Sequence, residues 1–316
     1  MGDVLISTKD LKKYFNTPKG LLHAVDGVNF EIERGSTLGV VGESGCGKST
    51  LGRVMLRLLD STDGSVLFEG KDITKMKRKE LLEFHRQAQM IFQDPYASLN
   101  PRLSTSELIA EPLIVNKIYK TSQEINEAVY KMMDTVGLAS RLVNTYPHEL
   151  DGGRRQRIGI ARALVLNPKF IVCDEPVSAL DVSIQAQILN LLMDLQEERK
   201  LTYMFITHDM SVVRHISNDI AVMYLGNCVE KAPSHELFAA PKHPYTQALL
   251  DAIPQPNLSR RGRERKILQG EIFSPIDPAP GCRFAPRCPY ATPECSKANI
   301  PLQECSPGHY VACIHV

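Results

Sequence analysis

The stretch Gly42-Glu43-Ser44-Gly45-Cys46-Gly47-Lys48-Ser49 decides the fold of this chain. It fits the pattern G-x-x-x-x-G-K-[ST], in which glycines let backbone N–H groups curl around phosphate oxygens. A short apolar run at 38–41 precedes it and an apolar-periodic stretch at 51–59 follows it. This is the strand–loop–helix setting that the pattern requires, and the helix N-terminus adds partial positive charge. We therefore predict a phosphate-binding P-loop.

The loop and the first turn of the following helix supply the expected contacts to a nucleotide. Lys48 should bind the β- and γ-phosphates, and the Ser49 hydroxyl should ligate Mg²⁺. Cys46 occupies a variable position at which only the backbone is needed, so no thiol chemistry is implied. A Gly-rich turn without a ligand is the alternative, but it rarely carries both Lys and Ser in this setting. The ATP-binding residues expected here are Gly42, Ser44, Gly45, Cys46, Gly47, Lys48, Ser49 and Thr50.

Two more apolar runs end in polar side chains. The run 170–173 leads into Asp174 and Glu175, and the run 204–207 leads into His208. Ligands of open α/β sheets bind at the carboxyl ends of the strands. We expect Asp174 to hold Mg²⁺ through water, Glu175 to polarise the attacking water, and His208 to contact the γ-phosphate. Alone, His208 is more often an ordinary surface histidine.

The remaining pattern predicts an α/β core with two additions. Short continuous apolar runs fit strands buried on both faces of a sheet, and apolar residues recur at helical spacing in 184–195. The stretch 64–72 predicts a small β element beside the core, and 104–147 predicts a helical insertion.

Composition excludes several classes of protein. The 316 residues carry 37 Lys+Arg against 36 Asp+Glu, and this balance argues against a chain that coats nucleic acid. No apolar run approaches the ~18–20 residues of a membrane span. The N-terminal residues lack the basic and hydrophobic regions of a secretory signal. We expect a soluble, cytosolic chain.

The C-terminal part differs in composition from the rest. Thirteen of the 20 prolines lie in 233–316, and five of the eight cysteines lie in the last 35 residues. We interpret the Pro- and Arg-rich stretch 254–281 as a linker whose arginines are solvated. Clustered cysteines in a cytosolic protein favour a metal over disulfides, and thiolates suit iron–sulfur clusters and zinc. The absence of C-x-x-C pairs counts against zinc.

Six motifs in order resemble the ATP-binding subunit of an ABC transporter, over about residues 4–250. They are the P-loop, Gln93 in Ile-Phe-Gln-Asp-Pro, the signature region 150–157, the Asp174-Glu175 strand, the Ser178-Ala179-Leu180-Asp181 segment, and His208. The resemblance implies a P-loop NTPase core with a small antiparallel β subdomain and a helical subdomain at about 98–158. It places the nucleotide-binding domain at 1–253, the linker at 254–281 and a Cys-rich extension at 282–316.

The same resemblance assigns three further residues. Tyr14, about 28 residues before the P-loop, should stack on adenine, with core packing as the alternative. Gln93 should ligate Mg²⁺, link it and the attacking water to the membrane partner, and join Glu175 and His208 as the catalytic set. Asp181 should lie at a dimer interface. The implied activity is ATP hydrolysis.

The stretches 94–102 and 243–246 and the Cys-containing extension look like the oligopeptide/dipeptide branch of importers. Relatives there import peptides, nickel, glutathione or oligosaccharides. This branch implies a peripheral protein at the cytoplasmic face of the membrane, with two permease subunits and an extracytoplasmic solute-binding protein as partners. It also implies a 4Fe-4S cluster on Cys282, Cys288, Cys295 and Cys313, with Cys305 as the alternative ligand.

The signature departs from the Leu-Ser-Gly-Gly-Gln of the family. Asp151 replaces Ser and Arg154 replaces Gln around Gly152 and Gly153, which should cap ATP held on the partner's P-loop. A carboxylate cannot donate to a phosphate, and two like charges ~4 Å apart repel by about 1 kcal/mol even in water. Arg154 or Arg155 could offset this repulsion by pairing with the phosphate or with Asp151. We expect a heterodimer with a related ATPase, in which this chain's own P-loop, Asp174 and Glu175 form the better site.

Four rival functions remain to be weighed. DNA-repair ABC proteins carry long coiled coils between the P-loop and the signature, translation factors carry two cassettes, and exporters are usually fused to membrane helices. None of these features is visible in the sequence. A non-catalytic regulatory subunit is the fourth, and the presence of Glu175 and His208 argues against it.

Overall fold

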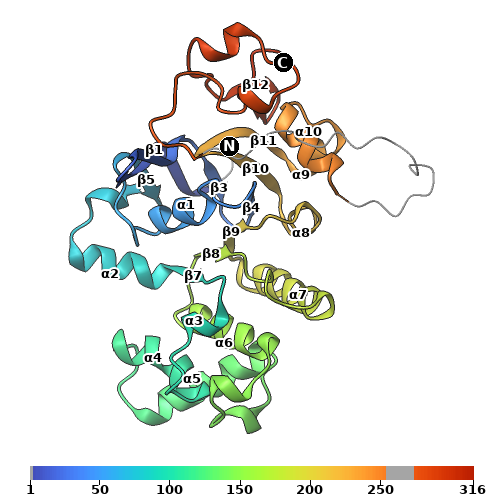
Figure 1. Ribbon diagram of the computed structural model, residues 1–316. Coiled ribbons are helices and arrows are strands. Elements are labelled where there is room, and N and C mark those ends of the chain that lie inside the picture. Colours follow the sequence, from blue (N-terminus) through green and yellow to red (C-terminus); the bar gives the residue numbers. More distant parts are fainter. Residues whose placement is uncertain (1–2, 254–273) are drawn as a thin grey trace, which may run out of the picture. The chain divides into compact units, whose positions relative to one another are not determined.

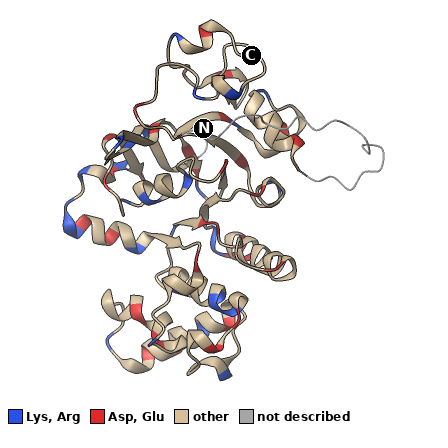
Figure 2. Ribbon diagram, viewed as in Figure 1, with Lys and Arg blue, Asp and Glu red and all other residues tan. Residues whose placement is uncertain are grey.

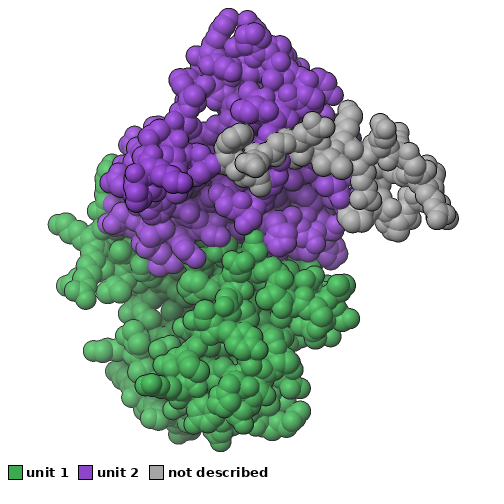
Figure 3. Space-filling model, viewed as in Figure 1, with its two compact units in different colours: residues 1–2, 75–204 green, residues 3–74, 205–316 purple. Residues whose placement is uncertain are grey.

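The computed structural model describes residues 3–253 and 274–316. The chain forms two compact units (Figure 3). One consists of residues 75–204, and the other of residues 3–74 and 205–316. The Arg-rich run of the predicted linker, 260–265, lies outside the described residues.

An antiparallel sheet begins the unit formed by 3–74 and 205–316 (Figure 1). Its central strand β1 pairs with β2, β3 and β5, and β5 pairs with β6. The strands are β1 (Val4–Thr17), β2 (Gly20–Val28), β3 (Glu31–Glu33), β5 (Asp63–Phe68) and β6 (Lys71–Asp72), followed by a 3₁₀ turn at Ile73–Lys75. The small antiparallel β element predicted around 64–72 is therefore present, and it includes the N-terminal strands.

A second sheet in the same unit positions the P-loop. β4 (Thr37–Val41) is buried at all five residues and pairs in parallel with β10 (Asp219–Tyr224). β10 pairs with β11 (Asn227–Pro233), which pairs with β13 (His309–Val311), and β13 pairs with β12 (Gln303–Ser306), all antiparallel. The α-helices among the described residues of this unit are α1 (Lys48–Met55), α8 (Met210–Ile216), α9 (Ser234–Ala239) and α10 (Pro244–Asp251).

The unit formed by 75–204 is mostly helical. Its helices are α2 (Arg78–Gln87), α3 (Pro95–Ser98), α4 (Thr105–Val115), α5 (Ser122–Thr135), α6 (Gly152–Leu164) and α7 (Val182–Arg199), with 3₁₀ turns at Ser140–Leu142 and Pro147–Glu149. β7 (Ala88–Ile91) and β8 (Phe170–Asp174) pair in parallel, and β9 (Thr202–Ile206) carries the chain into the other unit. Figure 2 shows basic and acidic residues, in blue and red, interspersed along the ribbon of α2.

Capping boxes explain where the helical insertion begins its helices. Ser104 and Glu107 form one before α4, and Thr121 and Glu124 form another before α5. Each pair satisfies backbone N–H groups that a helix start leaves without partners. The expected helical character of 104–147 is thus correct.

The C-terminal extension packs on the core of the unit formed by 3–74 and 205–316. Phe284 is 1% exposed and lies in one apolar cluster with Tyr224 and Tyr245. The C-terminal extension contains 3₁₀ turns at Ala285–Arg287 and Pro293–Ser296. At the end of the stretch predicted as a linker, Ile276 forms a β-bridge with Leu22. Among the described residues, no helix has the length and apolar character needed to cross a bilayer.

Candidate active site

The P-loop leaves β4 and enters α1 in a conformation that two glycines make possible. Gly47 has φ 103° and Gly42 has φ 152°. A Cβ on Gly47 would lie 2.0 Å from the carbonyl oxygen of Ala24, and one on Gly42 would lie 2.2 Å from that of Met223. Backbone oxygens cannot move aside cheaply, so the loop can follow this path only with glycine at both positions.

Lys48 is folded back over the loop that it terminates. Its side chain is buried, and its Nζ donates to the carbonyl oxygens of Gly42 at 2.8 Å and Glu43 at 3.0 Å. Cys46 is also buried, and burial raises the pKa of its thiol. A neutral, covered thiol reacts slowly, and the use of the Cys46 backbone alone stays a prediction.

Tyr14 lies on β1 in the same unit as the P-loop. Its ring stacks on that of His23 with centroids 3.9 Å apart, and its hydroxyl donates to Asp26 at 2.5 Å. Burial and the Asp26 contact raise the pKa of Tyr14 above its usual range. The phenol is therefore neutral and held by its neighbours, while its stacking on adenine stays a prediction.

His208 emerges beside the strand that leads into the P-loop. The residue before it, Thr207, donates its backbone N–H to the carbonyl of Val40 in β4 at 3.1 Å. His208 itself is exposed. The structure thus places His208 and the P-loop at the carboxyl ends of neighbouring segments of one unit.

In the unit 75–204, Gln93 and Glu175 come together. Asp174 ends β8 and is 1% exposed. Glu175 follows it with φ 46°, in the left-handed region that non-glycine residues seldom adopt. Gln93 Nε2 donates to Glu175 Oε2 at 3.0 Å. Strained backbone of this kind is often held at functional positions.

The signature region begins α6 with Asp151. The Asp151 carboxylate accepts the backbone N–H of Arg154 at 2.8 Å and forms a 3.3 Å ion pair with its guanidinium. Arg155 is buried, donates to the carbonyl of Pro147 at 2.5 Å, and lies 3.6 Å from the ring centroid of Tyr96. Of the two arginines expected to offset the charge of Asp151, only Arg154 pairs with it.

Gly152 and Gly153 form the first turn of α6 behind this cap. A Cβ on Gly153 would lie 2.7 Å from Ile184 Cγ2, so the glycine lets α6 approach α7. Asp181 caps α7 by accepting the N–H of Ile184 at 3.0 Å, and it is exposed. Its place at a dimer interface stays a prediction.

Cysteines of the C-terminal extension contact one another through the backbone, but the described side chains do not form a metal-binding group. The backbone N–H of Cys282 donates to the carbonyl of Cys295 at 2.7 Å. Burial raises the pKa values of Cys282 and Cys288, with smaller contributions from the charges of Cys295 and Cys313. Within the described ranges, no group of three or more His, Cys, Asp or Glu side chains is arranged to hold a metal ion.

Sequence reasoning missed two arginines of the extension that reach the nucleotide side of the fold. Arg283 donates to Asp26, and Arg287 donates to Glu43 of the P-loop. The only signal was their position, one residue from Cys282 and Cys288 respectively.

Comparisons with known proteins agree with this geometry. Residues 25–178 match the "ABC transporter" family, and residues 229–295 match the "Oligopeptide/dipeptide transporter, C-terminal region". The oligopeptide transport ATP-binding protein OppF of Escherichia coli is 52% identical over 98% of this chain and 92% of its own length. The dipeptide transport ATP-binding protein DppF of Haemophilus influenzae is 48% identical over 99% and 97%.

A solved structure shares the fold. The ATP-binding cassette MJ0796 bound to ADP and Pi superimposes with a TM-score of 0.67 at 29% identity, over 73% of this chain and 99% of its own. The predictions of an ABC ATPase fold and of the oligopeptide/dipeptide branch are confirmed by these matches. With its P-loop, its signature helix and relatives that match nearly its whole length, the chain belongs to the ABC transporter family of ATP-binding proteins.

Proposed function

We propose that this chain hydrolyses ATP to power an importer of oligopeptides or dipeptides. The observation that carries the proposal is the P-loop, whose two sterically required glycines and inward-folded Lys48 form a cradle for phosphates. The names of the relatives supply the substrate class. The protein would act at the cytoplasmic face of the membrane, in contact with two permease subunits, with a solute-binding protein outside.

In the proposed reaction, different residues bind the nucleotide, hold the metal ion and activate the water. The P-loop amides, Lys48 and Ser49 hold the phosphates, and Tyr14 stacks on adenine. Ser49 and Gln93 carry the oxygen atoms that Mg²⁺ prefers and would ligate it, and Asp174 would hold it through water. When bound there, Mg²⁺ would neutralise charge on the transferred phosphoryl group. Glu175 orients the attacking water. The hydrogen bond from Gln93 holds the Glu175 carboxylate in place. Through this bond, a movement of Gln93 caused by the membrane partner would also move the carboxylate.

The test uses the assembled transporter in lipid vesicles. We expect Glu175→Gln to lower phosphate release by at least about 100-fold while ATP still binds, since general-base catalysis contributes that much. Lys48→Ala should lose ATP binding itself. Hydrolysis that survives Glu175→Gln would refute the role of Glu175. Uptake of nickel, glutathione or oligosaccharide in place of peptides would reassign the substrate.

We also propose a heterodimer with a second, homologous ATPase. The support is Asp151, whose carboxylate can only accept hydrogen bonds where the family has a hydroxyl. Arg154 neutralises part of that charge, so the partner's ATP meets a paired carboxylate. Glu175→Gln in this chain should then cost more ATP turnover than the matching change in the partner. Equal losses would contradict the asymmetry, and loss only from the partner's change would indicate a regulatory role for this chain.

We further propose a structural 4Fe-4S cluster on Cys282, Cys288, Cys295 and Cys313. The support is the thiol donor set and the backbone contact between Cys282 and Cys295. Cys305 is exposed and donates to the carbonyl of His309 at 3.4 Å. Purified protein should contain iron and acid-labile sulfide, and Cys305→Ala should retain both. Zinc in place of iron would refute the cluster.

A further inference from the structure

The C-terminal extension reaches the P-loop through Arg287. Its Nη1 and Nη2 atoms donate to the two carboxylate oxygens of Glu43, at 2.9 and 3.2 Å. The side chains of Arg287 and Glu43 are only 5% and 21% exposed. Nη1 also lies 3.3 Å from the hydroxyl of Tyr224. This is a two-point, largely buried ion pair, the kind that fixes geometry as well as charge.

The backbone of Glu43 takes part in three hydrogen bonds that hold the P-loop. Its backbone N–H donates to the Tyr245 hydroxyl at 2.9 Å, and its carbonyl accepts from Lys48 at 3.0 Å. The N–H of Cys46 also donates to that carbonyl, at 3.3 Å. A shift of Glu43 therefore moves the Lys48 ammonium and the loop amides together.

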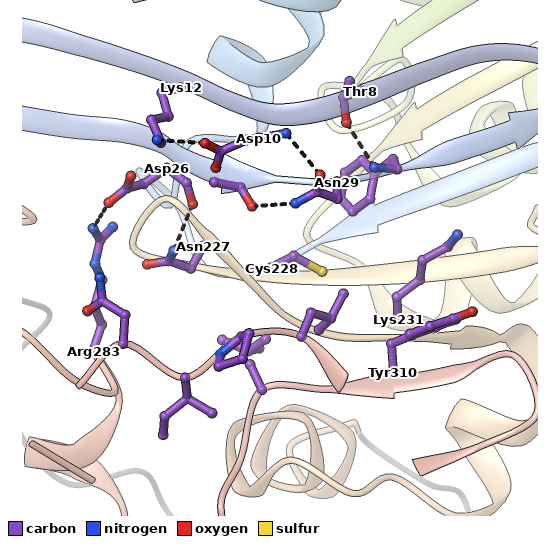
Figure 4. A pocket seen from close by; sticks show the side chains of 18 of the residues that line it. Thr8, Asp10, Lys12, Asp26, Asn29, Asn227, Cys228, Lys231, Arg283 and Tyr310 are labelled. Atoms are coloured by element: carbon purple, nitrogen blue, oxygen red, sulfur yellow. Dashed lines mark hydrogen bonds and ion pairs between the residues drawn. The ribbon is translucent and has the colours of Figure 1, made fainter. Parts of the chain in front are cut away.

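A second arginine of the extension, Arg283, contacts Asp26, the residue that holds the hydroxyl of Tyr14. Arg283 donates to Asp26 and to the carbonyl of Leu225 (Figure 4 shows Arg283 pointing at Asp26). The other oxygen of Asp26 accepts from Tyr14, and His23 Nδ1 lies 3.0 Å from the same carboxylate. Burial alone raises the pKa of Asp26, but hydrogen bonds from Tyr14 and His23 lower it overall.

Both contacts come from one short segment. Arg283 and Arg287 flank Phe284, whose ring lies 5.3 Å from Tyr224 and 5.4 Å from Tyr245 between centroids. The segment is thus anchored in the core and presents one guanidinium toward Asp26 and the other toward Glu43.

We propose that Arg287 and Arg283 are positioning residues of the nucleotide site, Arg287 for the phosphate cradle through Glu43 and Arg283 for the adenine-stacking face through Asp26. The inference rests on the proposed binding of ATP by the P-loop and Tyr14. It extends the site to a segment more than 200 residues from the P-loop in sequence.

The experiment measures ATP turnover of the assembled transporter as a function of ATP concentration. Arg287→Ala should raise KM for ATP by about tenfold or more and change kcat by less than about threefold, because breaking a buried pair displaces the binding loop and leaves the hydrolytic carboxylate in place. Arg287→Lys keeps the charge and should recover part of the loss. Lys297→Ala is the matched control, since it removes an exposed pair with Glu294 in the same extension.

A double-mutant cycle separates positioning from general destabilisation. If Arg287 acts through Glu43, then Arg287→Ala combined with Glu43→Ala should raise KM no more than the worse single change. Additive effects would overturn the role of the pair. Should Arg287→Ala fail to fold, Glu43→Gln and Arg287→Lys provide the same comparison, and an unchanged KM in both would overturn it.

Inorganic tripolyphosphate, used as a competitor, distinguishes the two arginines because it has phosphates and no base. Arg287→Ala should weaken its inhibition, whereas Arg283→Ala should weaken ATP binding and leave tripolyphosphate unaffected. Equal effects on both ligands would refute the division of roles. If Lys48→Ala leaves ATP binding intact, the proposed nucleotide site itself is refuted. If Lys48→Ala abolishes ATP binding but both arginine variants behave like the wild type, only the positioning role of the arginines is refuted.

Discussion

Replacing Phe284 by Ala tests whether the extension is part of the cassette core. The ring is 1% exposed and is surrounded by Tyr224, Tyr245 and His243, at centroid distances of 5.3, 5.4 and 5.8 Å. Truncating a buried Phe costs about 3–5 kcal/mol, from lost burial and the cavity left behind. At about 2 °C per kcal/mol for a chain of this size, we expect the melting temperature to fall by about 6–10 °C.

The assay is thermal unfolding followed by far-UV circular dichroism, with two matched variants. Phe284→Leu keeps most of the volume and loses the aromatic pairs, which contribute about 0.5–1.5 kcal/mol each, so its melting temperature should lie between those of Phe284→Ala and the wild type. Tyr290→Ala removes a half-exposed ring of the same extension and should change stability by less than about 0.5 kcal/mol. If Phe284→Ala melts within 1–2 °C of Tyr290→Ala, the extension does not share the core.

Three further predictions concern single residues. His243 is buried with its pKa lowered to about 4, and its Nδ1 accepts the N–H of Tyr245; the unfolded chain therefore takes up the proton first as pH falls. This preferential protonation of the unfolded chain should lower the free energy of unfolding by about 2 kcal/mol between pH 7 and pH 5. His243→Asn keeps the helix cap, so its free energy of unfolding, measured with urea, should fall less over the same pH range. Gly47→Ala should lower nucleotide affinity by at least about tenfold in a fluorescent-nucleotide titration, whereas Gly159→Ala, with open space at its Cβ, should slightly raise the melting temperature. Cys46→Ala should change ATP turnover less than about twofold, and Cys46 should resist maleimide at pH 7; rapid labelling of the folded protein would contradict its burial.

The local parts of this site were predictable and the long-range parts were not. The P-loop, the carboxylates after 170–173 and the histidine after 204–207 each follow from a few consecutive residues, and the structure ends its strands there. Contacts between residues hundreds of positions apart leave no pattern in a single sequence, so the Arg287–Glu43 pair could be found only in the structure. The stretch 243–246 marks the family in the sequence, and only the structure shows that the Tyr245 hydroxyl accepts the amide N–H of Glu43.

The skewed composition of the chain predicts a distinct C-terminal segment, and in the structure this segment is joined to the rest of its unit by several contacts. Ile276 pairs with β2, Phe284 fills the core, and Arg283 and Arg287 hold Asp26 and Glu43. A cysteine-rich segment is too small to bury a core of its own, so it gains stability from a metal, from the cassette, or from both.

The signature shows how a departure from a family pattern can keep one role while changing another. An N-cap must accept backbone N–H groups, and Asp does so at least as well as Ser. Asp151 accepts from Arg154 N at 2.8 Å, so α6 keeps its start. The anion also suits the positive end of a helix. Stability of this chain therefore gives no reason to avoid Asp at this position. In the heterodimer proposed above, the signature faces a phosphate held by the partner, and the substitution there exchanges a donor for an acceptor paired with Arg154.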